Sequence, residues 1–331
     1  MIASIAILCC ILYAGYDINP GDVQELIQQG LSYAYVEAFD SAHVSFDEII
    51  ARYPDNPAGY FYKAALLQLI MMDMCHFKHG KEYLSLMKQV RKKADMILSQ
   101  EDNPWASFYL GSSYTYQAVY EGLQGNYFET FQLGVKGGRM LQEIIKRDPT
   151  FYDAYLGAGT YEYFWARAAR YLPILKLGGG NVEEALRKLH IAAQKSYYSG
   201  PTANNSLAFI YGEEGMFEEA ERHIDTLLQQ YPGGRTFIWN KAEIEYKRGN
   251  FHEAKIQYQR LFDAYDSIPT KNYANLAQCK LFIGKCYYEL DDKQPAKQAF
   301  KDVIGYKKFS DEYPKIKTYS RDAYGMLSRI Y

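Results

Sequence analysis

The stretch PTANNSLAFIYGEEGMFEEAERHIDTLLQQYPGG, continued by RTFIWNKAEIEYKRGNFHEAKIQYQRLFDAYD, spans residues 201–266 and decides the fold. Its two halves repeat each other at an interval of 34 residues, since Ala208 corresponds to Ala242 and Ala220 to Ala254. Each half has apolar residues at helical spacing on either side of a glycine turn. Because one helical hairpin cannot bury its apolar face alone, the repeat predicts a stack of hairpins.

Four residues of the first half explain why it forms a hairpin. Ala208 and Ala220 are small where the two helix backbones come closest. Gly215 ends the first helix, because a residue without Cβ tolerates the left-handed cap, and Pro232 stops the second helix. This period and pattern resemble the tetratricopeptide repeat. The resemblance implies an all-α fold, namely a right-handed α-solenoid of helix-turn-helix repeats.

The small residue of the first helix can be followed along the whole chain, at intervals of 34, 47, 46, 51, 34 and 42 residues. This phasing predicts about seven repeats over residues 20–331, with a C-terminal capping helix from about Lys315 to Tyr331. The oversized middle repeats predict longer helices there, from Trp105 to about Gln124 and from Tyr127 to about Lys146. The phased small residues are Gly30, Ala64, Gly111, Gly157, Ala208, Ala242 and Gly284.

The N-terminal segment from Met1 to Tyr16 contains no charged residue. A helix of this length spans about 24 Å, which is less than the ~30 Å core of a bilayer. The length fits the apolar region of a secretory signal peptide, with Ala14 and Gly15 near a cleavage point, although no Lys or Arg precedes it. We therefore expect export to the periplasm or the outer membrane. The alternative is a cytoplasmic protein in which residues 1–16 pack against the first repeat.

The composition and the motifs argue against catalysis. The net charge of −2 gives no general signal for nucleic acid. No GxSxG or HExxH pattern is present, and the histidines are scattered except for His76 and His79, which by themselves favour a solvated or packing role. We therefore expect no enzyme, no metal site and no cofactor. Of the 33 tyrosines, we expect most to be structural and others to line a binding groove.

Two further stretches extend the comparison, NVEEALRKLHIAA (181–193) after a Gly-rich loop and YPGGRTFIWNKAEIEYKRGNFHEA (231–254). With regular repeats on both sides of long middle helices, they resemble the Iml2-type tetratricopeptide proteins of mitochondrial outer membranes and their bacterial relatives. This resemblance covers about residues 150–305. It implies a non-enzymatic repeat protein near an outer membrane or in a periplasm, and it transfers no site residues.

In the tetratricopeptide fold, the first helix of each repeat lines the concave surface, where a peptide or helix of a partner protein binds. Trp239 and Tyr246 are the expected anchors. A chaperone-tail adaptor is disfavoured, because Phe209 and Glu243 stand where that class needs Asn or Lys. The sequence indicates no oligomeric state. The predicted groove residues are Phe108, Tyr116, Tyr161, Asn205, Trp239, Tyr246, Lys247 and Lys285.

Two alternatives stay open. The loop Gly178–Asn181 with Arg167 and Arg170 is a candidate anion site, which would make the protein a small-ligand binding protein or an enzyme. The loop lacks the lysine of a P-loop, so a flexible loop capped by Asn181 is the simpler interpretation. The basic region 293–329 suits a peripheral membrane protein that contacts anionic lipid.

Overall fold

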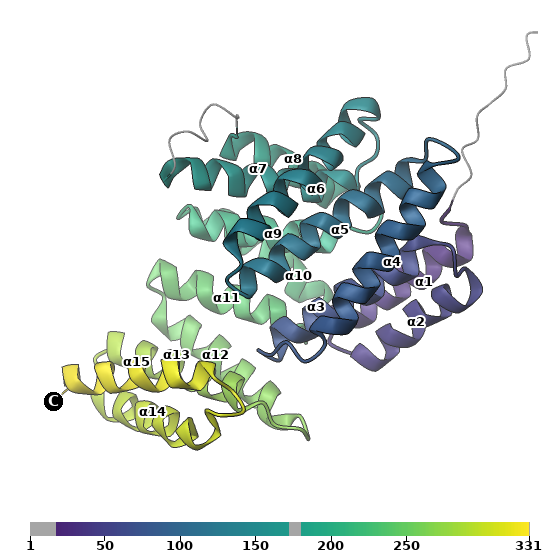
Figure 1. The fold of residues 1–331 in the computed structure, drawn as a ribbon. Coiled ribbons are helices and arrows are strands. Elements are labelled where there is room, and N and C mark those ends of the chain that lie inside the picture. Colours follow the sequence, from purple (N-terminus) through teal and green to yellow (C-terminus); the bar gives the residue numbers. More distant parts are fainter. Residues whose placement is uncertain (1–17, 172–179, 331) are drawn as a thin grey trace, which may run out of the picture.

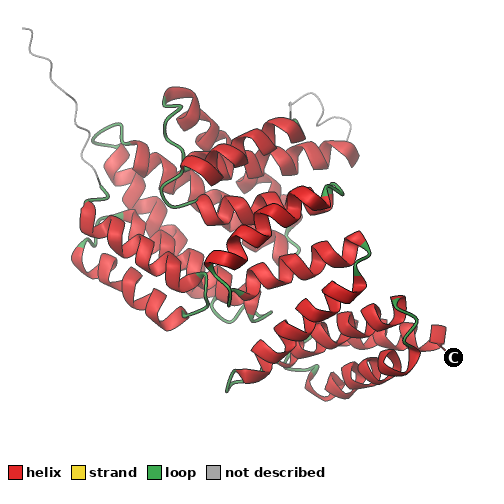
Figure 2. Ribbon diagram, turned by 180° about the vertical axis from the view of Figure 1, so that it is seen from behind, coloured by secondary structure: helices red, strands yellow, loops and turns green. Residues whose placement is uncertain are grey.

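The computed structural model describes residues 18–171 and 180–330, and every element in these ranges is helical (Figures 1 and 2). The predicted signal segment 1–16 lies outside the described residues. The helices are α1 (Gly21–Ala34), α2 (Phe39–Arg52), α3 (Pro57–Asp73), α4 (Gly80–Leu98), α5 (Pro104–Leu123), α6 (Tyr127–Arg147), α7 (Ala154–Tyr171), α8 (Val182–Lys195), α9 (Gly200–Glu213), α10 (Phe217–Gln230), α11 (Arg235–Arg248), α12 (Phe251–Ser267), α13 (Tyr273–Glu289), α14 (Lys293–Gly305), the short 3₁₀ helix η2 (Tyr306–Phe309) and α15 (Lys315–Ile330).

Consecutive helices pack against each other, so that the described chain forms seven pairs from α1–α2 to α13–α14. The last helix, α15, packs against both α13 and α14. The middle helices α5 and α6 have 20 and 21 residues, whereas α9, α10 and α11 have 14 each. The predicted all-α solenoid with longer middle helices is therefore confirmed.

Local signals set the helix ends. The side chains of Asn56, Asn103 and Asn181 each accept a hydrogen bond from a backbone N–H in the first turn of the following helix. Proline follows two of these asparagines at the first helical position, where its missing N–H costs nothing. The backbone of Gly215 has a φ of 78°, which confirms its predicted left-handed conformation after α9.

The long helices α5 and α6 cross at a contact between their backbones. A Cβ on Gly137 would lie 2.6 Å from the carbonyl oxygen of Gly111 and 2.8 Å from the backbone nitrogen of Thr115. Gly111 is one of the phased small residues, so its predicted place at a close approach is confirmed. Ala208, at the same position of a regular repeat, is completely buried.

The solenoid curves so strongly that its first two repeats touch repeats five to seven (Figure 1). The hydroxyls of Tyr35, after α1, and Thr202, in α9, hydrogen-bond at 3.1 Å. The ring of Tyr62, in α3, lies 5.9 Å from that of Tyr198, just before α9. Residues at or just after the ends of α1 and α3 thus contact the starts of α9, α11 and α13. The chain therefore covers part of its own concave side.

We predict opposite effects for two glycine substitutions in α6. Gly137→Ala should lower the free energy of unfolding by about 1–3 kcal/mol, because its Cβ would collide with the backbone of α5. Gly134→Ala should raise it by about 0.5–1 kcal/mol, because the nearest atom would be 3.8 Å away and alanine favours a helix. Urea denaturation followed by circular dichroism measures both values. Equal effects of the two variants would contradict the close crossing.

Candidate binding surface on the inner helices

The predicted groove residues of α5 and α7 pack into the protein interior. Phe108 is only 6% exposed, and its ring lies 5.5 Å from Trp105 and 5.7 Å from Phe151. The ring centroid of Tyr116 lies 5.1 Å from that of Phe61 of α3 in a T-shaped contact, and burial raises the pKa of the Tyr116 hydroxyl. The inner side of α5 is therefore part of the hydrophobic core of the early repeats, and these side chains are not open to a partner.

Tyr161 is half-buried at the contact between α6 and α7. Its ring lies against Gly138, at a position where no Cβ would fit, and 5.8 Å from the ring of Trp165. Burial is also the main cause of the raised pKa of its hydroxyl. The structure thus assigns Tyr161 a packing contact between two helices.

Trp239 belongs to a hydrogen-bonded network that joins α3, α11 and α12, which we call the Asp73 network. The indole N–H of Trp239 donates to the hydroxyl of Tyr265 at 3.0 Å, and this hydroxyl donates to Asp73 at 2.8 Å. The guanidinium of Arg235 donates to both carboxylate oxygens of Asp73, at 3.1 and 2.7 Å. The network also includes Glu37. A partner that used Trp239 as its anchor would compete with these contacts.

In the Asp73 network, Arg235 contacts two carboxylates, those of Glu37 and Asp73. The backbone N–H of Arg235 donates to Glu37 at 2.7 Å, and the guanidinium lies 4.0 Å from the other carboxylate oxygen of Glu37. The side chains of Glu37 and Asp73 are each only 3% exposed. Burial raises the pKa of Glu37 to about 7, although the charge of Arg235 opposes this shift. Removing Arg235 would leave both carboxylates buried without a cation.

The remaining predicted residues lie on α9, α11 and α13 and keep part of their surface accessible. The ring centroids of Tyr246 and Phe282 are 5.8 Å apart in a T-shaped contact, and the ammonium of Lys285 lies 4.9 Å from the centroid of the same Phe282 ring. Asn205 accepts a hydrogen bond of 3.1 Å from Asn240, and Lys247 forms an ion pair with Glu213. Together with Phe209, which lies 6.0 Å from the ammonium of Lys247, they form the inner strip. The inner strip consists of Asn205, Phe209, Tyr246, Lys247 and Lys285.

Glu243 adds an acid to this surface, and the repeat phase of the sequence already places it on the inner side of α11 with Trp239, Tyr246 and Lys247. Burial raises the pKa of its carboxyl, the charge of Lys247 lowers it, and that of Glu213 raises it. Glu243 forms no ion pair with any other residue in the described ranges. Its position on α11, one turn after Trp239, is the one that the repeat phase predicts for an inward-facing residue.

Known proteins resemble this chain in its helical repeat fold. The model of the tetratricopeptide repeat family matches residues 234–307. Residues 234–307, from α11 to the start of η2, thus match the tetratricopeptide repeat. The crystal structure of PilW, a widely conserved type IV pilus biogenesis factor, superposes with a TM-score of 0.50 at 14% sequence identity, over 76% of this chain and 97% of PilW. This likeness shows the fold alone.

Two other solved structures give lower scores. A tetratricopeptide repeat protein from Parabacteroides merdae has a TM-score of 0.43 at 16% identity, over 91% of this chain and 98% of its own. Yeast Tom70 has a TM-score of 0.43 at 15% identity, over 95% of this chain and 66% of its own. No curated protein matches the chain. The narrower resemblance to the Iml2-type proteins stays a prediction.

The arginines of the candidate anion site already form ion pairs with glutamates of α9 and the turn after it. Arg167 donates to Glu213 at 2.7 Å, and Arg170 forms an ion pair of 2.9 Å with Glu214. Gly178 and Gly179 lie outside the described residues. An anion would have to displace both carboxylates, so the paired arginines argue against this alternative.

Two histidines that seemed scattered in the sequence are neighbours between the fourth and fifth repeats. The ring centroids of His190 and His223 are 5.2 Å apart, and the ring of Tyr211 stacks on His223 at 5.7 Å. His190 shares a hydrogen bond of 2.7 Å with Tyr211, and His223 shares one of 2.8 Å with Asn204. Burial is the main cause that lowers the pKa of His223 to about 4, and the charge of His190 adds to it.

Within residues 18–171 and 180–330, no three or more His, Cys, Asp or Glu side chains come together as metal ligands. In the same ranges, no helix is both long enough and apolar enough to span a membrane.

We predict that Arg235→Leu lowers the free energy of unfolding by about 3–5 kcal/mol, because two buried carboxylates lose their cation. Arg187→Leu is the control, since Arg187 is exposed and pairs with Glu184 within the same helix. Its effect should stay within about 0.5 kcal/mol. Urea denaturation measures both variants, and similar losses would contradict a special role for Arg235.

A second prediction concerns how the stability of the protein depends on pH below neutrality. The pKa of His223 is lower in the folded than in the unfolded chain, so the unfolded state binds more protons below pH 6.5. Stability should therefore fall as the pH drops from 6.5 towards 4. His223→Gln should reduce this fall by on the order of 1 kcal/mol, given partial exposure. Urea midpoints at pH 7 and pH 5 measure it, with His252→Gln on the surface of α12 as the control. An unchanged pH dependence in His223→Gln would refute the assignment.

Proposed function

We propose that this protein is a non-enzymatic scaffold that binds a segment of a partner protein on the inner strip. The observation that carries the proposal is the accessible surface left on α9, α11 and α13 after the first repeats have closed over the rest. Phe209 and Tyr246 offer aromatic area, and Lys285, which forms no ion pair in the described ranges, offers charge. Such a mixture suits an extended or helical peptide.

Glu243 indicates which charge the proposed partner segment carries. Burial penalises its charged form, and Lys247 offsets this penalty only in part, without an ion pair to Glu243 in the described ranges. A lysine or arginine of the partner segment would supply that cation and gain a charge-assisted hydrogen bond. We therefore propose a partner segment that combines an apolar side chain with a basic one.

Rigid packing explains how such a scaffold would work. The inner strip lies on helices whose opposite faces are buried against α10, α12 and α14, so its side chains are held in place before binding. Preorganisation lowers the entropic cost of association, which means that a modest strip can give useful affinity. No chemical step is required of the protein.

We propose a location in the bacterial cell envelope, because residues 1–16 resemble the apolar region of a signal peptide. The basic region 293–329 supports a membrane role less well, since Lys317 and Arg321 each lie near an aspartate, at 3.7 and 3.8 Å.

Site-specific crosslinking tests both proposals in one experiment. A photoreactive phenylalanine analogue at position 209 should crosslink a partner segment in the envelope fraction, and intact mass should show the loss of about 14–16 N-terminal residues. In titrations with that purified segment, Phe209→Ala combined with Tyr246→Ala should weaken binding at least tenfold, equal to about 1.4 kcal/mol. Ile256→Ala, which removes an exposed apolar side chain from α12, is the control.

Three results would count against these proposals. Unchanged binding by the double variant would exclude the inner strip, and equal loss with Ile256→Ala would show a nonspecific effect. Recovery of the full-length chain from the cytoplasm would exclude export and leave the inner strip to be tested with cytoplasmic partners.

A further inference from the structure

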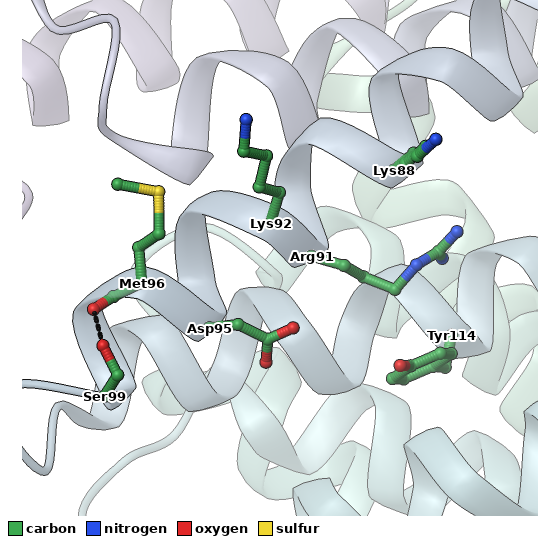
Figure 3. Close-up of a pocket in the computed structure, with 7 residues that line it drawn as sticks. All are labelled: Lys88, Arg91, Lys92, Asp95, Met96, Ser99 and Tyr114. Atoms are coloured by element: carbon green, nitrogen blue, oxygen red, sulfur yellow. Dashed lines mark hydrogen bonds between the residues drawn. The ribbon is translucent and has the colours of Figure 1, made fainter.

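A second surface lies on α4, the outer helix of its pair, where it meets α5. A shallow hollow of about 600 Å³ opens there, and Figure 3 shows Arg91 extending from α4 toward Tyr114 of α5. Three of its residues are basic and one is acidic. The lining residues are Lys88, Arg91, Lys92, Asp95, Met96, Ser99 and Tyr114.

Tyr114 holds two cations beside this hollow. The guanidinium carbon of Arg91 lies 5.2 Å from the centroid of its ring, and the ammonium of Lys136 lies 4.0 Å from it. Lys136 also donates a hydrogen bond of 2.7 Å to the hydroxyl of Tyr114, and Arg91 donates one of 3.0 Å to Gln117. All of these partners are neutral, so both positive charges stay uncompensated and fixed in place.

Neighbouring lysines, in contrast, form ion pairs with aspartates. Lys93, the next residue on α4, forms an ion pair of 2.7 Å with Asp55, and Lys63 pairs with Asp47 at 2.6 Å. By comparison, Lys88, Arg91, Lys92 and Lys136 form no ion pair with a carboxylate of the described chain. A group of cations without carboxylate partners concentrates anions at the surface. The hollow therefore fits a negatively charged ligand.

The spacing along α4 restricts the shape of that ligand. Lys88, Lys92 and Met96 follow one another at intervals of four residues, which is a rise of about 6 Å per step on one face of the helix. Alternate side chains of an extended peptide are about 6.6–6.8 Å apart and point to the same side. The two spacings match, and Met96 is 46% exposed at the end of the row.

We infer that this hollow binds an extended acidic peptide in which two carboxylates at alternate positions face Lys88 and Lys92 and an apolar side chain faces Met96. A nucleic acid strand would place a phosphate against Met96 and Asp95, where neither side chain compensates its charge. The site lies on a different helix from every residue of the inner strip, so it is independent of the function proposed above. It would let the scaffold hold two partner segments at once.

Fluorescence anisotropy on the full chain tests the inference, with a labelled peptide Gly-Ser-Glu-Ser-Glu-Ser-Leu-Ser-Gly and its reversed sequence as probes. At least one probe should bind at low ionic strength, and binding should weaken at least tenfold when both Glu are replaced by Gln. Lys88→Glu combined with Lys92→Glu should also weaken it at least tenfold, and Met96→Ser a few-fold. Lys301→Glu on α14, also an exposed lysine, should change binding less than twofold.

Several outcomes would overturn the inference. These are equal binding of the Gln peptide, no binding of either probe, or full binding by the double variant. Phosphatidylglycerol vesicles and a thymidine oligonucleotide provide the remaining comparison. If either bound more tightly than the peptides and lost its binding in the double variant, the surface would be a lipid or nucleic acid site instead. Circular dichroism of each variant confirms that the helices are intact.

Discussion

Arg235 binds two buried carboxylates, and the shape of the whole solenoid depends on that ion cluster. Asp73 ends α3 and Glu37 lies between α1 and α2, so both belong to the first two repeats. Arg235 begins α11 of the sixth repeat. A buried ion pair is not in itself a strong source of stability, because desolvation costs about as much as attraction gains. This cluster instead fixes the shape of the solenoid, since Arg235 can pair with both carboxylates only when the first two repeats meet the sixth.

That geometry decides which part of the concave face can bind a partner. Packing between neighbouring repeats buries Phe108 on the inner side of α5, and the closure brings Trp239 into the Asp73 network. The inner side chains of α9, α11 and α13 stay accessible. A surface that would run along all repeats of an open solenoid is thus restricted here to the C-terminal half.

The helices could be predicted from the sequence because their signals are local. The predicted helix from Tyr127 to about Lys146 differs from α6 by one residue, and Gly215 adopts the expected left-handed cap. The repeat phase also placed Trp239 and Tyr246 correctly on first helices. The hydrogen bonds of Asp73 could not be predicted, because Asp73 and Arg235 are 162 residues apart and neither interrupts the repeat pattern.

The contact between early and late repeats also changes how the protein should open. In a linear solenoid each repeat touches only its neighbours, so the terminal repeats fray and unfolding proceeds inward from the ends. Here the first repeats are bonded to the fifth, sixth and seventh, and α1 is not a free end in this sense. Amide protons of α1 and α3 should then exchange as part of one cooperative unit with α11. Such contacts between distant segments also slow folding, because a long loop must close before they form.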